Sequence, residues 1–299
     1  MSVKWGRNYQ LCIQRQDGQI QQINYPLTLE FNIVRQPCSS TNTGTFRIYN
    51  LSPDTRQAIY RDRYDWNTSR SLTLAAGYGN APLSFIFKGK CYQAYSWRES
   101  GRVDYITEIM GNDMFTMVTA FSNTTLQGNQ PKQTVVNNLL TNLTNADSNV
   151  GVGYIAPVTG SYPRGRTLFG PTWPLLQQET GKNAFIDNGL IHVLSPNEYF
   201  VGGITVIDSS TGLLSTPKKA ESWLTVEILF EPNINIGQQI QLSSSYTVYN
   251  GLYKVMGLEH RGIISGAVNG KCTTKLFLLI PPAKWTQIIN QGLPQVPNG

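Results

Sequence analysis

The chain has 299 residues, of which 14% are charged, and a formal net charge of +6 at pH 7. That charged fraction is well below the roughly 25% of an average globular protein, so much of the polar surface must consist of neutral side chains. Such a surface suits coverage by neighbouring subunits, and it fits an ordinary β-rich protein equally well. The modest net charge, with acidic residues interleaved among the basic ones, argues against a dedicated nucleic-acid binder.

Residues 1–117 are predicted to form a first antiparallel β domain. In Leu29–Ile33, apolar and polar residues alternate with the period of a strand that has one buried face. Strands at Tyr9–Arg15 and Gln19–Asn24 flank Asp17-Gly18, a strong hairpin signal. About seven such strands are expected to form an antiparallel barrel or sandwich.

One helix interrupts these strands and is predicted to span Pro53–Tyr64. Ser52 is a good N-cap and Pro53 fits the first helical position. Basic and acidic residues alternate around it, which indicates a salt-bridged helix surface rather than a phosphate-binding stripe. These residues are Asp54, Arg56, Arg61, Asp62, Arg63, Asp65 and Arg70.

Residues 118–205 are predicted to form a small α+β module. Its elements, in chain order, are a helix at Pro131–Leu143, a long loop at Asn145–Gly165, a short helix at Thr172–Gly181 and a hairpin at Asn183–Leu194 that turns at Asn188-Gly189. Gly181 is expected to take the left-handed conformation that often follows a helix end.

Residues 206–285 return to strand periodicity and are predicted to form a second antiparallel β domain, with 286–299 as a C-terminal tail. The expected elements are a strand at Leu224–Phe230, further alternation through Ile234–Leu242, a hairpin at Tyr246–His260 about Asn250-Gly251, and a last strand at Lys271–Ile280 before Pro281-Pro282. The end of the tail, Gly292–Gly299, is rich in Pro, Asn and Gly and is expected to fray.

The two histidines are the first candidates for chemistry. His192 lies between Ile191 and Val193 in a predicted strand, so a structural histidine is the favoured interpretation. His260 follows Glu259, but neighbours in a strand point to opposite faces, so the carboxylate cannot easily orient the imidazole. We therefore predict no catalytic residue at either position.

Other chemical sites are equally poorly supported. Glu99, Asp104, Glu108 and Asp113 could supply a carboxylate pair for glycoside cleavage, yet they fit solvated strand faces and turns better. Gly77-Tyr78-Gly79 fits a turn rather than a phosphate cradle. No cofactor-binding residue and no metal ligand is predicted.

The compartment is predicted from cysteines and hydropathy. The four cysteines have no metal-binding spacing and are expected to be reduced, partly buried thiols; they are Cys12, Cys38, Cys91 and Cys272. The polar start of the chain shows no leader peptide, and no run approaches the ~18 apolar residues of a membrane helix. Folding in the cytoplasm is therefore expected.

Three segments together resemble the central hub proteins of bacteriophage tail baseplates. Phe46–Arg61, with Ile-Tyr-Asn-Leu-Ser-x-x-Thr at its centre, is similar to the start of the first barrel of these hubs. Thr211–Leu242 resembles the start of their second barrel, and Asn250–Val255, followed by His260 and Gly262, resembles the closing hairpin. Ile263 is a departure, because an acidic or polar residue is expected there.

The resemblance implies a structural virion protein rather than an enzyme. Such hubs form a homotrimer in which each subunit gives two tube-like antiparallel β-barrels. The resulting pseudo-hexameric ring adapts a hexameric tail tube to a trimeric spike and lines a channel for tape measure protein and DNA. The implied partners are the tail tube or tube-initiator protein, the spike and the tape measure protein, in a phage tail or a related contractile injection machine.

Two other functions remain open at this point. Some hubs carry a peptidoglycan hydrolase domain, although this chain has no spare ~100 residues and no credible acid/base pair. The frequent aromatic residues (15 Tyr, 6 Trp and 11 Phe) would suit a β-sandwich carbohydrate-binding module. The first would clear a peptidoglycan suspension, and the second would bind glycan as a monomer.

Overall fold

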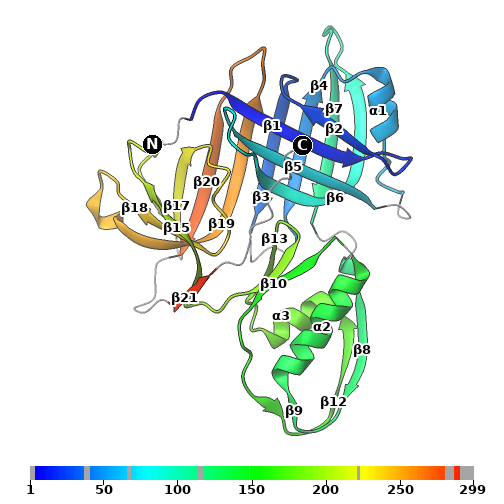
Figure 1. The fold of residues 1–299 in the computed structure, drawn as a ribbon, viewed down its shortest axis with the longest axis vertical. Helices are drawn as coiled ribbons and strands as arrows, with labels where there is room; N and C mark the ends of the chain where they lie inside the picture. The colour runs from blue at the N-terminus through cyan, green and yellow to red at the C-terminus, as the bar shows by residue number, and fades with distance from the viewer. Residues whose placement is uncertain are drawn as a thin grey trace.

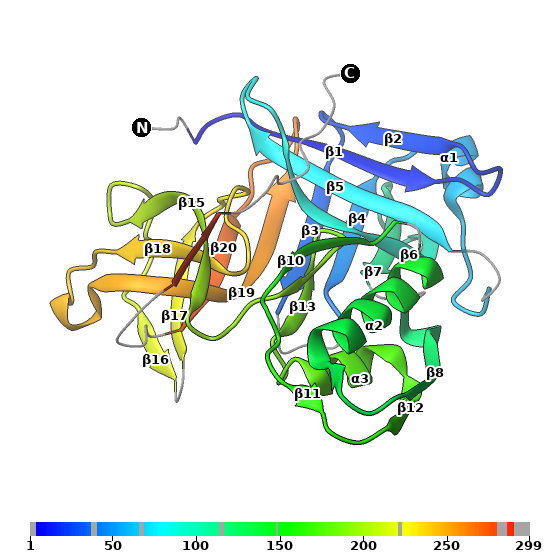
Figure 2. The ribbon, with the colours of Figure 1, turned by 60° about the horizontal axis from the view of Figure 1, so that its bottom comes forward.

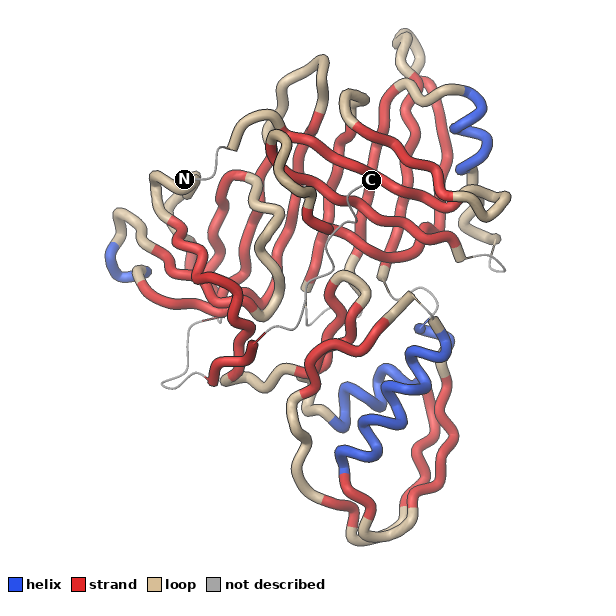
Figure 3. Tube along the Cα trace, viewed as in Figure 1, coloured by secondary structure: helices blue, strands red, loops and turns tan. Residues whose placement is uncertain are grey.

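The computed structural model describes residues 4–36, 41–65, 69–113, 117–147, 149–220, 223–279 and 286–289. Within these ranges the protein is mainly β, with large antiparallel sheets at both ends of the chain and an α+β module between them in sequence (Figure 1). The predicted fold class is therefore confirmed. The two longer helices both belong to the middle module, which lies at one end of the molecule (Figure 3).

The first β module is a strongly curled sheet in the order β3-β4-β7-β6-β5-β1-β2. Its strands are β1 (Arg7–Gln14), β2 (Ile20–Asn24), β3 (Leu29–Arg35), β4 (Thr43–Tyr49), β5 (Arg70–Tyr78), β6 (Ser84–Arg98) and β7 (Tyr105–Asn112). Leu29, Phe31 and Ile33 are buried, as their alternation predicts. The hairpin at Asp17-Gly18 is also confirmed, because Gln14 pairs with Ile20 on either side of it.

Helix α1 (Pro53–Ile59) is shorter than predicted. Ser52 caps its start by accepting the Thr55 backbone N–H at 3.2 Å. The helix ends early because Arg61 pairs instead with Ala94 of β6, through backbone hydrogen bonds of 2.8 and 3.0 Å. The guanidinium of Arg70 donates to the carbonyls of Ile59 and Tyr60, which the helix leaves free.

Arg56 and Arg61, two of the arginines around α1, contact backbone and aromatic groups. Arg61 is buried and donates to the carbonyls of Cys91 and Asp65. The guanidinium of Arg56 lies 3.8 Å from the centre of the Tyr105 ring. These contacts fix the loop after the helix against β6 and β7.

The middle module packs two helices against short strands. Its larger elements are β8 (Phe121–Leu126), α2 (Lys132–Ala146), β10 (Gly151–Ile155), β12 (Arg166–Pro171), α3 (Thr172–Glu179), β13 (Ala184–Asp187) and β14 (Leu190–Val193). The apolar face of α2 predicted from the sequence is buried, and it shares a core with Leu176 and Ile191. Gly181 has φ +63 just beyond α3, as predicted.

The prediction of a long loop at Asn145–Gly165 is wrong in part. It contains β10, which pairs in parallel with β14, and the two-residue strand β11 (Ser161–Tyr162), which pairs with β9 (Gln130–Pro131). Parallel pairing joins elements far apart in sequence, so local composition does not indicate it. The hairpin between β13 and β14 is confirmed, with Asn188 and Gly189 both at positive φ.

The second β module has strands β15 (Glu198–Ile207), β16 (Lys218–Ala220), β17 (Trp223–Leu229), β18 (Gln238–Leu242), β19 (Gly251–Ile264), β20 (Cys272–Leu279) and β21 (Thr286–Ile289). The alternation in Leu224–Phe230 is confirmed, because Leu224, Val226 and Ile228 are buried in one cluster. β15 pairs in parallel with β18 and with β21, so the module is not purely antiparallel. Gly292–Gly299 lies outside the described residues.

The predicted hairpin about Asn250-Gly251 is wrong. β18 pairs with β19 from Leu242 opposite Gly251, and the connection includes a short 3-10 helix at Thr247–Tyr249. Asn250 has φ −75, so it does not take the conformation of a tight Asn-Gly turn. Its side-chain oxygen instead accepts the Ser244 backbone N–H at 2.7 Å across the base of this loop.

Strand β19 joins the two β modules. Gly251–Lys254 pairs with β18, whereas Leu258–Ile264 pairs with β3 of the first module. The register of β19 with β20 shifts between Val255 and Gly257, at the point where β19 changes partner. Such a bulge bends a strand and increases its twist. One hydrogen-bonded path of strands therefore crosses both modules (Figure 2).

The hydrophobic clusters do not follow the predicted domain limits strictly. Phe230, Ile264 and Cys272 come from the second β module but pack in the core of the first. β15 begins before residue 206 and continues beyond it. The predicted boundaries stay a prediction. None of the helices in the described ranges is long and apolar enough to cross a membrane.

Gly262→Ala is expected to destabilise the junction between β19 and β20. A Cβ there would lie 2.6 Å from the Cα of Cys272, a backbone atom that cannot move cheaply. Overpacking of this kind costs about 1–3 kcal/mol. Urea unfolding measures it, with Gly151→Ala as control, since that Cβ would meet only the flexible end of Leu190 at 3.0 Å. Equal losses in the two variants would contradict the prediction.

Candidate assembly surface

Eight neighbouring strands, β16-β17-β20-β19-β3-β4-β7-β6, present a continuous face directed away from the buried cores. Residues directly opposite each other on paired strands share a face, so the register identifies its members. We call it the outer face. It includes Lys218, Thr225, Glu227, Thr273, Lys275, Glu259, Arg261, Glu30, Asn32, Arg47, Glu108, Tyr95 and Trp97.

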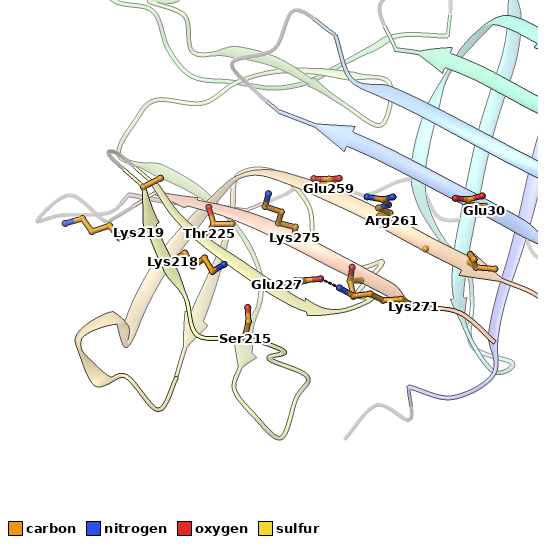
Figure 4. Close-up of a pocket in the computed structure, with 14 residues that line it drawn as sticks. Glu30, Ser215, Lys218, Lys219, Thr225, Glu227, Glu259, Arg261, Lys271 and Lys275 are labelled. Atoms are coloured by element: carbon orange, nitrogen blue, oxygen red, sulfur yellow. Dashed lines mark hydrogen bonds and ion pairs between the residues drawn. The ribbon is translucent and has the colours of Figure 1, made fainter.

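Charges of both signs alternate across the outer face. On the second β module they line a groove of about 740 Å³ that reaches Glu30 of β3 (Figure 4). Lys271 Nζ donates to Glu227 Oε1 at 2.6 Å, and this contact lowers the pKa of the Glu227 carboxyl. Lys218, Arg261 and Lys275 add further cations to the groove. A surface of this composition stays hydrated and carries no strong excess of positive or negative charge.

The first β module continues the face with a bonded row of side chains. Glu108 of β7 accepts Arg47 Nε at 2.6 Å from β4 on one side. On the other side it accepts the Tyr95 hydroxyl of β6 at 2.7 Å. Trp97 stacks on Tyr95, with ring centres 5.2 Å apart. The carboxylate is thus fully engaged in ordering three strands.

All three modules meet at a buried polar junction below this sheet. Arg35 of β3 is almost fully buried, and its Nη1 lies 3.0 Å from Asp187 Oδ1 of β13. Its Nη2 donates to the carbonyl of Ile234, between β17 and β18, at 2.9 Å. Burial raises the pKa of the Asp187 carboxyl, and the charge of Arg35 counteracts that shift. One guanidinium therefore contacts all three modules.

Asn42 and Asp113 form a second part of the junction. The Asn42 backbone N–H donates to Asp113 Oδ1 at 2.9 Å, and its Nδ2 donates to Asp113 Oδ2 at 2.6 Å. The same Nδ2 donates to the carbonyl of Ile186 in β13 at 2.8 Å. Burial raises the pKa of Asp113 to about 7. These contacts hold the middle module on the first β module.

A buried ion pair completes the contact between these modules. Lys90 Nζ of β6 lies 3.4 Å from Asp147 Oδ1, which follows the end of α2. Both side chains are more than nine-tenths buried. They line a small cavity of about 110 Å³ together with Asp113 and Gly189. The arrangement orients one module on the other and places no free nucleophile or base there.

His192 has the surroundings of a core residue. Its Nδ1 accepts the Tyr154 backbone N–H at 3.1 Å. Its ring stacks on Phe185 and meets Phe200 edge-on, with centres 5.4 and 5.1 Å away. Burial lowers the pKa of His192 to about 4, so the imidazole is neutral at physiological pH.

His260 and Glu259 lie on opposite faces of β19, as strand geometry requires. His260 is completely buried, with Nδ1 2.9 Å from Thr274 Oγ1 and its ring edge-on to Phe230. Burial and the charge of Arg35 lower its pKa well below the usual value. Glu259 lines the groove of the outer face. The two side chains therefore form no acid/base pair.

The four carboxylates weighed for glycoside cleavage have separate partners. Glu99 pairs with Arg102 at 2.9 Å, and Asp104 accepts Asn50 Nδ2 at 2.7 Å. Glu108 and Asp113 have the contacts given above. Within the described ranges, no group of three or more His, Cys, Asp or Glu side chains is placed to hold a metal ion.

The cysteines are free thiols wherever they are described. Burial raises the pKa of both Cys91 and Cys272 to about 11, and it also raises that of Cys12. Cys38 lies outside the described residues.

Sequence reasoning missed the polar junction, although one signal pointed to it. Arg35 occupies the next inward position after Leu29, Phe31 and Ile33 on the same strand. An arginine in phase with a buried apolar row implies a buried partner, and the acidic residue of the β13–β14 hairpin supplies it.

A model of the baseplate hub gp41 family matches residues 10–261 of this chain. No curated protein sequence matches this chain.

Solved structures share the fold at low identity. A tail protein from Neisseria meningitidis has 10% identity and a TM-score of 0.56, with 92% of this chain and 97% of that chain covered. The 43 kDa tail protein of prophage MuSo2 from Shewanella oneidensis has 7% identity and a TM-score of 0.58, with 90% and 97% covered. An E. coli type VI secretion component, described as structurally similar to T4 tail proteins gp27 and gp5, has 9% identity and a TM-score of 0.57, with 91% and 78% covered.

Proposed function

Because the chain belongs to the baseplate hub gp41 family, we propose that it is a structural hub of a phage tail baseplate. In this role it adapts a hexameric tail tube to a trimeric spike, as a homotrimer in the virion. Its two β modules provide two tube-like units per chain, so three chains provide six. The fold likeness to an E. coli protein described as similar to T4 tail proteins gp27 and gp5 supports this role.

The continuous outer face carries the proposal further. Eight strands about 4.8 Å apart span about 38 Å, and three such sheets in a ring enclose a space roughly 37 Å across between opposite backbones. The alternating charges of the outer face suit a channel wall that tape measure protein and DNA pass without adhering. No residue is assigned a catalytic role, since the buried histidines and the engaged carboxylates serve the fold.

Single-particle electron microscopy of the purified chain, alone and with tube and spike proteins, tests the proposal. The expected particle is a ring of three chains with six similar lobes and an open centre. A chain that stays monomeric in every mixture would overturn the hub role. A peptidoglycan turbidity assay on the same sample should show no clearing, and clearing would instead favour a tail-associated hydrolase.

A further inference from the structure

The contact between the middle module and the first β module is made by polar groups. Asn42 Nδ2 donates to the Ile186 carbonyl at 2.8 Å, and Lys90 Nζ lies 3.4 Å from Asp147 Oδ1. In the described ranges, the buried apolar residues of these two modules fall into separate clusters. The docking of the two modules therefore depends on hydrogen bonds and charges rather than on a shared apolar core.

The middle module contacts the second β module differently. Phe185 and Leu194 of the middle module share a buried apolar cluster with Phe200 and Ile236 of the second β module. Apolar contacts are non-directional and contain no group that titrates, so this cluster can hold while polar contacts beside it break. It is a suitable pivot for a movement of the middle module.

Asp113 is the buried carboxyl of this junction that has no cation. The other two carboxyls each have one, in the pairs Arg35–Asp187 and Lys90–Asp147, at 3.0 and 3.4 Å. Both oxygens of Asp113 accept instead from the neutral Asn42. Among the ion pairs of the described ranges, none involves Asp113. Its ionised form therefore leaves three buried carboxylates against two buried cations at the junction.

Charged groups face Asp113 from each element packed against it. Burial raises the pKa of Asp113 to about 7, the hydrogen bonds from Asn42 lower it, and the charge of Asp187 in β13 raises it. Arg35 of β3 partly offsets the charge of Asp187. The cavity of about 110 Å³ beside Asp113 is lined by three more charged groups, of which Lys88 is only partly buried: Lys88, Lys90 and Asp147.

We propose that the middle module docks reversibly on the first β module, and that ionisation of Asp113 releases it to turn on its apolar contact with the second β module. In the docked state, the neutral carboxyl leaves no buried charge without a partner. In the released state, water reaches the ionised carboxylate and removes the cost of its burial. The device does not depend on the hub role, because all its parts lie within one chain.

The direction of the pH dependence follows from Asp113. A carboxyl in water keeps its ordinary pKa of 3.8, whereas that of the docked group is about 7. Because the docked pKa is raised, the contribution of Asp113 to docking is complete below pH 3.8 and is lost as the pH rises towards 7. The equilibrium constant for release should rise about tenfold per pH unit in this window, about a thousandfold in all, and level off above pH 7.

Thiol labelling of the full chain measures the release. Ser71→Cys places a thiol on β5 in the wall of the cavity, which has room for water but not for a fluorescein maleimide. The thiol therefore reacts when the modules separate. Rates at residue 71 are measured by peptide mass spectrometry from pH 5 to 8, with and without Asp113→Asn.

The ratio of the rate without Asp113→Asn to the rate with it cancels the ionisation of the thiol. This ratio should rise about tenfold per pH unit up to pH 7 and then stay constant. The amide introduced by Asp113→Asn donates towards Asn42 Nδ2, which weakens docking equally at every pH, so the slope is the readout. Asp104→Asn is the matched control, because Asp104 is exposed and also accepts from an asparagine, at 2.7 Å. It should keep the wild-type slope.

Two native cysteines make the result decisive. Cys12 is partly exposed and lies outside the cavity, so the rate at residue 71 relative to Cys12 gives the same slope if Asp113→Asn does not fold. Cys91 is buried in the core of the first β module and reports unfolding. A slope of zero would overturn the proposal. Labelling of Cys91 as fast as residue 71 would also overturn it, since the chain would then unfold rather than release a module.

Discussion

Replacing Arg35 with methionine is expected to reduce the free energy of unfolding by about 3–5 kcal/mol, the usual cost of leaving one partner of a buried ion pair alone. The variant removes the cation 3.0 Å from Asp187 and the donor to the Ile234 carbonyl. The variant leaves the Asp187 carboxylate without its cation, although burial already disfavours the charged form and the buried Asp113 lies nearby. Urea unfolding at neutral pH measures the loss.

Two further variants show whether the loss comes from the junction. Arg102→Met breaks the exposed pair with Glu99 and should change stability by less than about 1 kcal/mol. Arg35→Met combined with Asp187→Leu should be more stable than Arg35→Met alone, because no buried charge is left without its partner. A double variant less stable than the single one would contradict this account of the junction.

The junction also shows where sequence reasoning ends for this fold. Strands with one buried face, such as β3 and β17, follow from alternation alone, and the hairpins at Asp17-Gly18 and Asn188-Gly189 follow from two-residue turns. In each case the deciding information lies within a few neighbouring residues. The same local reasoning gave the helices α2 and α3.

Features that depend on distant segments were missed or misplaced. Helix α1 ends early because Arg61 pairs with β6, and β10 is a strand because β14 lies beside it. The outer face exists because β19 changes partner from β18 to β3 along its length. The amino-acid composition of β19 does not indicate this change. For the candidate surface, the resemblance to baseplate hubs predicted a protein built for assembly, whereas composition left that open, and the strand register was needed to place the surface residues on one face.

The wild-type chain is expected to lose about 3 kcal/mol of its free energy of unfolding between pH 6.5 and pH 4 because of His192. The variant His192→Asn should not show this loss. The pKa of His192 is about 4 in the folded chain against 6.5 for the ordinary group. The folded pKa is depressed, so this stability is complete above pH 6.5 and is lost as the pH falls towards 4, at about 1.4 kcal/mol per pH unit. The asparagine oxygen can still accept the Tyr154 N–H.

The measurement is the free energy of unfolding of both chains between pH 4 and 7. His260 acts in the same direction as His192, because its pKa is also lowered. Asp113 acts oppositely: its pKa is raised to about 7, so its contribution is complete below the ordinary value of 3.8 and is lost as the pH rises. His260 and Asp113 remain in the variant, so their contributions cancel in the difference in unfolding free energy between wild type and variant. Any stability advantage of the wild type should therefore shrink, or reverse in favour of the variant, as the pH falls below 6.5. A difference independent of pH would show that His192 is already exposed or charged in the folded protein.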